Sequence, residues 1–189
     1  LHVYVLDGRG DQRLTELTAH TGCVAVVRLH ERERLMRLLH RLRGLTRAGM
    51  AQRSEIRVVL FIDGLDAVRR ALDEVATATE FDALEEVLAN GEAAGITIVA
   101  GVEHAAAVPA GLLARCAHRW VMHLHDAHDA TVLGLAAARV PAASVAGRLV
   151  VAASDLAAQV MQPGASSTTA GDGSPATTPA VAGICIVPA

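Results

Sequence analysis

The stretch Ile56-Arg-Val-Val-Leu-Phe-Ile-Asp63 carries the clearest fold signal in the chain. Its apolar run is not interrupted by polar residues, and it ends at an aspartate that is followed by Gly64. A half-exposed strand alternates apolar and polar side chains, whereas a central strand of a parallel sheet, covered on both faces, does not. We therefore expect residues 58–63 to form a buried, central, parallel strand.

Similar apolar runs lie before and after this stretch. They cover residues 2–7, 23–27, 96–100 and 119–124. Between them, residues 31–43 place leucines at positions i, i+3, i+4 and i+7, and residues 81–88 repeat an amphipathic helical pattern. Residues 145–153 and 156–161 have the pattern of a closing hairpin. This alternation of strands and helices predicts an α/β domain with a mostly parallel sheet and flanking helices.

Two predicted strands end in an aspartate, Asp7 and Asp63. Ligands of open α/β sheets bind outside the carboxyl ends of the strands, so both residues are site candidates. The 58–63 run also has the form of a Walker B strand, which delivers a carboxylate to the sheet rim to hold Mg²⁺ directly or through water. A purely structural strand followed by Asp-Gly has the same pattern, and both interpretations stay open at this point.

The composition excludes several classes of protein. With 189 residues and 52% hydrophobic residues, the chain can form one domain with a substantial core. Its net charge of −3 argues against a globally basic nucleic-acid binder, and 2% aromatic residues argue against a base-stacking platform. All 17 basic residues are arginines, so the chain cannot supply the lysine of a phosphate-binding P-loop.

The two ends of the sequence differ in character. The chain starts directly with a strand-like run, and we interpret it as an internal fragment of a longer protein. From Pro163 onward, Gly, Ser, Thr and Pro predict a flexible tail or linker over residues 163–189, and the apolar run 181–187 is interpreted as part of a downstream element. No window has the roughly 18 apolar residues of a membrane span, and the three cysteines form no CxxC pair. We therefore expect a reduced, cytoplasmic setting.

Residues 1–162 resemble the C-terminal three-quarters of an ATPase domain of the FtsK/SpoIIIE family, which includes DNA translocases and type VII secretion ATPases. The resemblance rests on the following pieces in family order: His2-Val-Tyr-Val-Leu-Asp7, Ala19-His20, the arginine-rich residues 28–47, the Walker B-like residues 58–63, Gly91-Glu-Ala-Ala-Gly-Ile96, Arg119-Trp-Val-Met-His-Leu124, Val140-Pro141 and Gly147-Arg148.

The resemblance implies a RecA-like domain, incomplete at its N-terminal side, in a ring or a tandem array that moves DNA or drives protein export. It implies ATP and Mg²⁺ as cofactors, with Asp63 as the Walker B residue that positions Mg²⁺ and Asp7 supporting the same rim. It also makes Arg148 a candidate arginine finger. The parent protein would be membrane-anchored, with this domain on the cytoplasmic side.

Three departures from the family pattern weaken the prediction of an active enzyme. No GxxxxGK[ST] loop is present, so the triphosphate has no cradle in this chain. Gly64 stands where motor members have a glutamate that positions the attacking water, and Val102 stands where they have a polar sensor. The resemblance therefore implies weak or absent hydrolysis. The alternative function is a non-catalytic, degenerate ATPase module that acts as an interaction or ring-scaffold domain.

Three further groups of residues are candidates for a function. His123 and His125, with Cys116 and Asp126, could form a metal site, although a polar loop is the simpler interpretation. Residues 28–53 carry a local charge of +6, which suits a nucleic-acid face or, as we prefer, pairing with the acidic residues 63–92. The other arginine-finger candidates are Arg115, Arg119 and Arg139; for Arg148 a structural role in the hairpin is the preferred interpretation.

Overall fold

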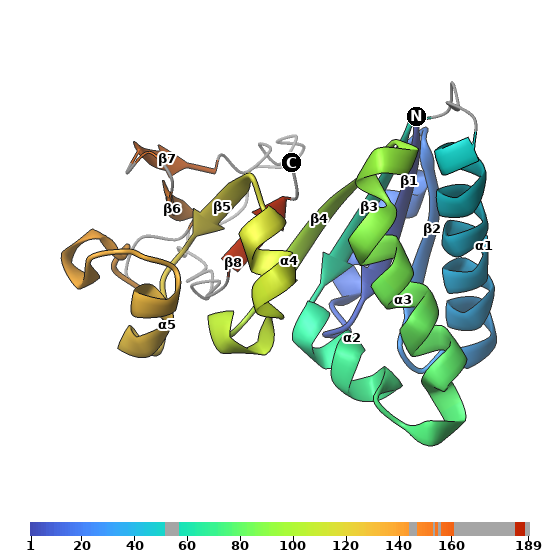
Figure 1. The fold of residues 1–189 in the computed structure, drawn as a ribbon. Helices are drawn as coiled ribbons and strands as arrows, with labels where there is room; N and C mark the ends of the chain where they lie inside the picture. The colour runs from blue at the N-terminus through green and yellow to red at the C-terminus, as the bar shows by residue number, and fades with distance from the viewer. Residues whose placement is uncertain (52–56, 144–146, 153, 155, 161–183, 188–189) are drawn as a thin grey trace, which may run out of the picture.

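A computed structural model describes residues 1–51, 57–143, 147–152, 154, 156–160 and 184–187 (Figure 1). Its strands form one sheet in the order β2-β1-β3-β4-β8-β5-β6-β7. Among the described residues, none of the helices has the length and hydropathy required to cross a membrane.

The first half of the sheet is parallel and contains the strand that the sequence predicts as central. Its members are β1 (His2–Asp7), β2 (Cys23–Arg28), β3 (Val58–Asp63) and β4 (Ile96–Val102). β3 lies between β1 and β4, and its register with β1 runs from His2↔Val58 to Asp7↔Asp63. The predicted α/β class, with a parallel sheet flanked by helices, is therefore confirmed for these four strands.

Helices cover one face of this sheet (Figure 1). They are α1 (Arg32–Ala51), α2 (Leu65–Leu72), α3 (Ala78–Asn90) and α4 (Ala110–Arg115). The leucines that predicted a helix over residues 31–43 are buried in α1, as expected for the apolar stripe of an amphipathic helix. The remaining short elements are η2 (Val75–Thr77), η3 (Glu92–Ala94), η4 (Ala105–Ala107), α5 (Ala127–Val132) and η5 (Ala137–Arg139).

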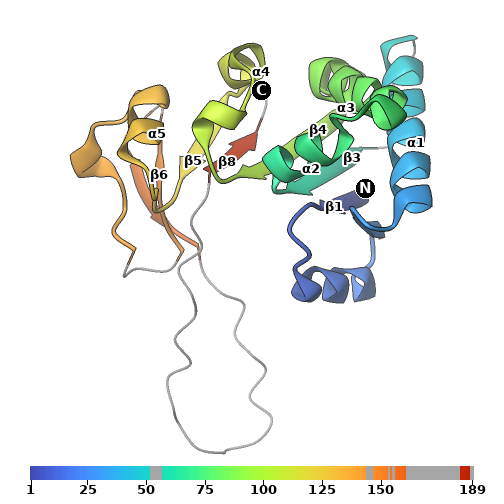
Figure 2. The same ribbon diagram turned by 90° about the horizontal axis from the view of Figure 1, so that it is seen from below.

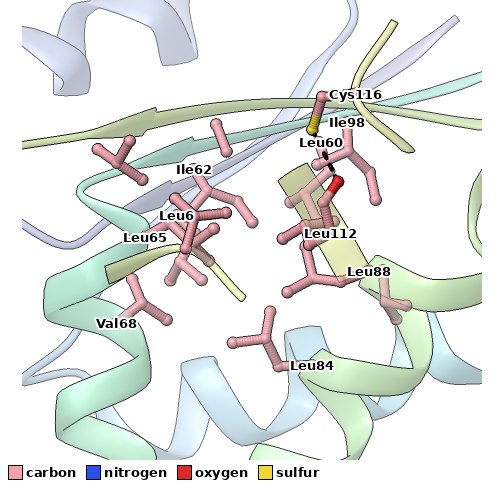
Figure 3. Packing of buried hydrophobic residues seen from close by; sticks show 14 of the residues in the cluster. Leu6, Leu60, Ile62, Leu65, Val68, Leu84, Leu88, Ile98, Leu112 and Cys116 are labelled. Atoms are coloured by element: carbon pink, nitrogen blue, oxygen red, sulfur yellow. Dashed lines mark hydrogen bonds between the residues drawn. The ribbon is translucent and has the colours of Figure 1, made fainter. Parts of the chain in front are cut away.

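The core lies between the sheet and these helices. Figure 3 shows labelled side chains of β1, β3 and β4 (Leu6, Leu60, Ile62, Ile98) packed with those of α2, α3 and α4 (Leu65, Val68, Leu84, Leu88, Leu112). The thiol of Cys116 joins this cluster and donates a 3.1 Å hydrogen bond to the carbonyl of Leu112. Burial of this apolar area is the main contribution to stability.

The opposite face of the parallel strands is less well covered than the sequence predicts. Only the 3₁₀ helix η1 (Gln12–Ala19), deep blue in Figure 2, lies on that side of β1 among the described helices, and none of its residues is buried. In β3 the side chains therefore alternate in exposure: Leu60 and Ile62 are buried, whereas Phe61 between them is 42% exposed. The expectation of a strand covered on both faces is correct for one face only.

The second half of the sheet is antiparallel. β6 (Arg148–Val151) and β7 (Leu156–Gln159) form the predicted closing hairpin, and β5 (His118–Val121) pairs with β6. β8 (Ile184–Val187) lies between β4 and β5 and is antiparallel to both. The interpretation of this last strand as part of a downstream element is therefore wrong, because it pairs within this sheet. The other residues of the predicted tail, 163–183 and 188–189, lie outside the described residues.

Candidate functional site

The candidate site is the rim formed by the carboxyl ends of β1, β3 and β4. Asp7 and Asp63 end neighbouring strands and are paired in register. On the other side of β3, a Cβ atom placed on Gly101 of β4 would lie 3.6 Å from Oδ1 of Asp63. Parallel strands point their carboxyl ends to the same edge, which is why sequence reasoning could place the two aspartates together.

Asp7 is an anchor for the loop that follows β1. Its buried Oδ1 accepts hydrogen bonds from the backbone N–H groups of Arg9, Gly10 and Asp11 at 3.1, 2.6 and 3.2 Å. Its Oδ2 has no hydrogen-bond partner but lies 3.5 Å from Nε of Arg28. The three backbone donors converge on the chain's own carboxylate, so this nest of N–H groups is already filled.

Asp63 faces a cation of the same chain. Nε of Arg9 lies 4.0 Å from Oδ1 of Asp63, and Nη2 of Arg9 lies 2.7 Å from Oε1 of Glu103, just after β4. Burial raises the pKa of Asp63, the charge of Arg9 opposes this shift, and neighbouring carboxylates add to it. Arg9 thus connects the ends of β3 and β4.

Gly64 leaves room for this arginine. Its φ of +73° lies in the left-handed region, and a Cβ atom at this position would lie 2.9 Å from Cγ of Arg9. A glutamate at position 64, which the family resemblance leads one to expect, would displace Arg9. The glycine and the arginine are therefore structurally coupled.

A cavity of about 630 Å³ lies beside the rim, on the poorly covered face of the sheet. Arg9 and Asp63 line it together with apolar side chains of several strands, including Val3, Val5, Phe61, Val99 and Trp120. The continuous apolar runs in the sequence predict strands that are covered on both faces, so the sequence does not reveal this cavity. The polar lining is concentrated in a few groups, which suits an apolar occupant better than a triphosphate.

Two arginine-finger candidates, Arg148 and Arg115, lie away from Asp63 within this chain. Arg148 is exposed at the start of β6, and three strands separate β6 from β3 in the sheet order. Arg115 donates to the carbonyls of Ala89 and Leu88 at 2.5 and 3.3 Å, at the end of α3. Action of Arg148 on the nucleotide site of a neighbouring subunit remains a prediction.

The histidine cluster does not converge. The rings of His123 and His125 are 5.2 Å apart, Nδ1 of His123 lies 3.2 Å from the carbonyl oxygen of Pro141, and Asp126 caps α5 by accepting from the N–H of His128. Across the described part of the chain, no three His, Cys, Asp or Glu side chains form a group that could hold a metal ion. This geometry gives no support to a metal-dependent enzyme.

The acidic residues 63–92 do neighbour the arginine-rich helix, as preferred from the sequence. Arg47 of α1 forms a two-point ion pair with Glu86 of α3, with N–O distances of 2.6 and 2.7 Å. His40 of α1 lies 3.9 Å from Glu80 of α3. Part of the positive charge of α1 is therefore neutralised within the chain, which weakens the case for a nucleic-acid face.

The described rim residues do not fit Mg²⁺-ATP by themselves. The nest of backbone N–H groups is occupied by Asp7, the Asp63 carboxylate faces Arg9, and the adjacent cavity is mainly apolar. A hard cation such as Mg²⁺ needs several free oxygen ligands, and a triphosphate needs free donors.

The four-stranded parallel sheet and its flanking helices give the domain a RecA-like α/β fold. A structure of "EssC (ATPases 2 and 3)" from Geobacillus thermodenitrificans matches the chain with a TM-score of 0.64 and 15% identity, over 83% of this chain and 32% of that one. No protein-family model and no curated protein matches. The resemblance seen in the sequence is thereby confirmed as a likeness of fold to EssC, of whose chain this one spans about a third.

Proposed function

We propose that residues 1–162 form a non-hydrolysing module of an FtsK/SpoIIIE-like tandem ATPase of the type VII secretion kind, on the cytoplasmic side of a membrane-anchored parent. The module would supply contacts to neighbouring ATPase segments. The observation that carries this proposal is the apolar cavity on the open face of a parallel sheet, since such sheets are normally covered on both faces.

The state of the rim supports a role without hydrolysis. Arg9 faces Asp63, and Gly64 and Val102 have no side-chain atoms that could position a water or bind a phosphate oxygen. The occupant of the open face would be a strand-and-helix segment of the same ATPase, because a helix packs its apolar stripe on such a face. Exposed Phe61 and Trp120 offer large apolar contacts there.

A pair of matched variants in the intact parent protein tests the docking role. Phe61→Glu places a charge on the open face, whereas Val132→Glu places one on α5, where Val132 is 37% exposed. We expect Phe61→Glu to weaken assembly, measured by light scattering after size-exclusion chromatography, and Val132→Glu to leave it unchanged. Equal behaviour of the two variants would contradict the role of the open face.

A second candidate is a nucleotide-binding role in which another segment supplies the phosphate cradle. The position of Asp63 at the end of a buried strand, one strand from Asp7, favours it. Titration calorimetry with Mg²⁺-ATP on this chain and on the parent, together with turnover of Asp63→Ala and Asp82→Ala parents, separates the candidates. Turnover lost only in Asp63→Ala would support the nucleotide site, and unchanged turnover in both variants would support the non-hydrolysing module.

A further inference from the structure

Arg9 is placed between two carboxylates that end neighbouring strands. Its guanidinium is 2.7 Å from Glu103 and 4.0 Å from Asp63, and its side chain is only 29% exposed. Asp63 itself is 35% exposed. A cation shared by two carboxylates at a sheet rim has the arrangement that a divalent metal ion would have at the same place.

We propose that Arg9 takes the place of a divalent cation between Asp63 and Glu103, so that the chain itself closes its rim to Mg²⁺. This inference concerns the rim of the proposed module and rests on that function for its biological meaning, but its test uses this chain alone. It predicts that removal of the guanidinium uncovers a cation site which the native chain does not offer.

The backbone positions Arg9 for this contact. The Asp7 carboxylate accepts hydrogen bonds from the backbone N–H groups of Arg9 and Gly10. The N–H of Gly8 donates a 2.7 Å hydrogen bond to the backbone carbonyl of Asp63. A Cβ atom on Gly8 would lie 2.5 Å from that same carbonyl oxygen. The loop therefore approaches β3 closely because position 8 is a glycine, and this brings Arg9 over Gly64.

The surrounding charges favour a cation at this position. The carboxylates of Asp7, Asp11 and Asp66 add negative charge around Asp63. The charge of Asp7 is compensated by Arg28, and the charge of Asp11 is compensated by Arg13. Without Arg9, the charges of Asp63 and Glu103 would have no partner among the ion pairs of the described residues.

The chain contains a matched control for this inference. Arg13 lies four residues further along, at the start of η1, is 70% exposed and pairs with Asp11 rather than with the rim. Arg9→Ala and Arg13→Ala remove the same charge from the same segment. A difference between the two variants is therefore due to the contact with Asp63 and Glu103 and not to net charge.

The experiment measures binding of Mn²⁺ alone, by electron paramagnetic resonance and by the thermal midpoint of unfolding. We expect Arg9→Ala to have a lower midpoint than the native chain, to recover part of the loss in Mn²⁺, and to bind Mn²⁺ at least about tenfold more tightly. Arg13→Ala should behave like the native chain. Arg9→Gln, which keeps most of the apolar stem, should show the same gain if Arg9→Ala does not fold.

The double variant Arg9→Ala/Asp63→Asn locates the site, because the gain in Mn²⁺ binding should disappear. Equal Mn²⁺ affinity of the native chain and Arg9→Ala, or a gain that persists in the double variant, would overturn the inference. These outcomes do not depend on assembly or turnover of the parent. Failure of the proposed function and failure of this inference can therefore be distinguished.

Discussion

Oδ1 of Asp7 accepts a 2.6 Å hydrogen bond from the backbone N–H of Gly10, and two further N–H groups point at the same oxygen. An aspartate at the end of a parallel strand was expected to serve a ligand. In this chain Asp7 instead binds the loop that follows β1, and this loop positions Arg9 next to Asp63 at the end of the neighbouring strand. The same position in the fold can thus have a structural role in place of a chemical one.

Replacement of Asp7 should destabilise the fold. Asp7→Ala leaves three inward-pointing N–H groups without their acceptor, and we expect a loss of about 3 kcal/mol in the free energy of unfolding. Asp7→Asn keeps an acceptor oxygen and should lose less. Urea unfolding measures both, with Asp11→Ala as the control in the same loop. A loss in Asp7→Ala no larger than that in Asp11→Ala would contradict the anchoring role.

Asp63 should make stability depend on pH. Because its pKa is raised in the folded chain, chiefly by burial, the folded state holds this proton more tightly than the unfolded state. The resulting stabilisation is fully present at pH values below 3.8, the ordinary pKa of an aspartate, and it is lost as the pH rises through the raised pKa of Asp63.

Asp63→Asn removes this titration. Its free energy of unfolding relative to the native chain should therefore increase with pH over that window and then level off. Urea unfolding at a series of pH values measures the difference, with Asp82→Asn on α3 as the control. A difference that is constant across the window, or that decreases with pH, would rule out a raised pKa of Asp63.

Cys116 should react slowly with thiol reagents. Burial raises the pKa of its thiol to about 11, so that about one molecule in a thousand carries the thiolate near pH 8. Cys23 is partly exposed at the start of β2. We expect iodoacetamide to modify Cys116 much more slowly than Cys23 in the folded chain, and both at similar rates in urea, as measured by peptide mass spectrometry. Rapid modification of native Cys116 would contradict its burial.

Removal of β8 should lower the thermal midpoint of unfolding. This strand pairs with residues 100–102 of β4 and with residues 118–121 of β5. Its loss therefore leaves two strand edges unpaired inside the sheet. The interpretation of residues 163–189 as a flexible tail predicts no change. A chain ending at residue 183 tests this against a control that ends at residue 187. Equal midpoints would show that β8 adds nothing to the stability of the sheet.

The parts of the fold that depend on local periodicity could be predicted from the sequence. The apolar run of β3 and the leucine spacing of α1 specify a strand and a helix whatever their neighbours are. The exposure of Phe61 could not be predicted in this way, because it depends on which helices cross which face of the sheet. A run of apolar residues has the same pattern whether one face or both are covered.

The candidate site was predictable only in part. Asp7 and Asp63 share a rim because both end parallel strands, which is a rule of topology. Arg9 and Glu103 meet there through contacts between distant parts of the chain, and neither was singled out. The one available signal was the sequence Gly8-Arg9-Gly10 directly after a strand-end aspartate, where glycines permit a close approach of the loop.

The position of Trp120 on the open face has a practical consequence. It is the only tryptophan in the chain, it is 38% exposed, and its side chain lines the cavity. Its indole emission therefore reports whether that face is in contact with water or with an apolar neighbour, without any added dye. The fold thus contains its own fluorescent probe at the surface that we propose as a docking face.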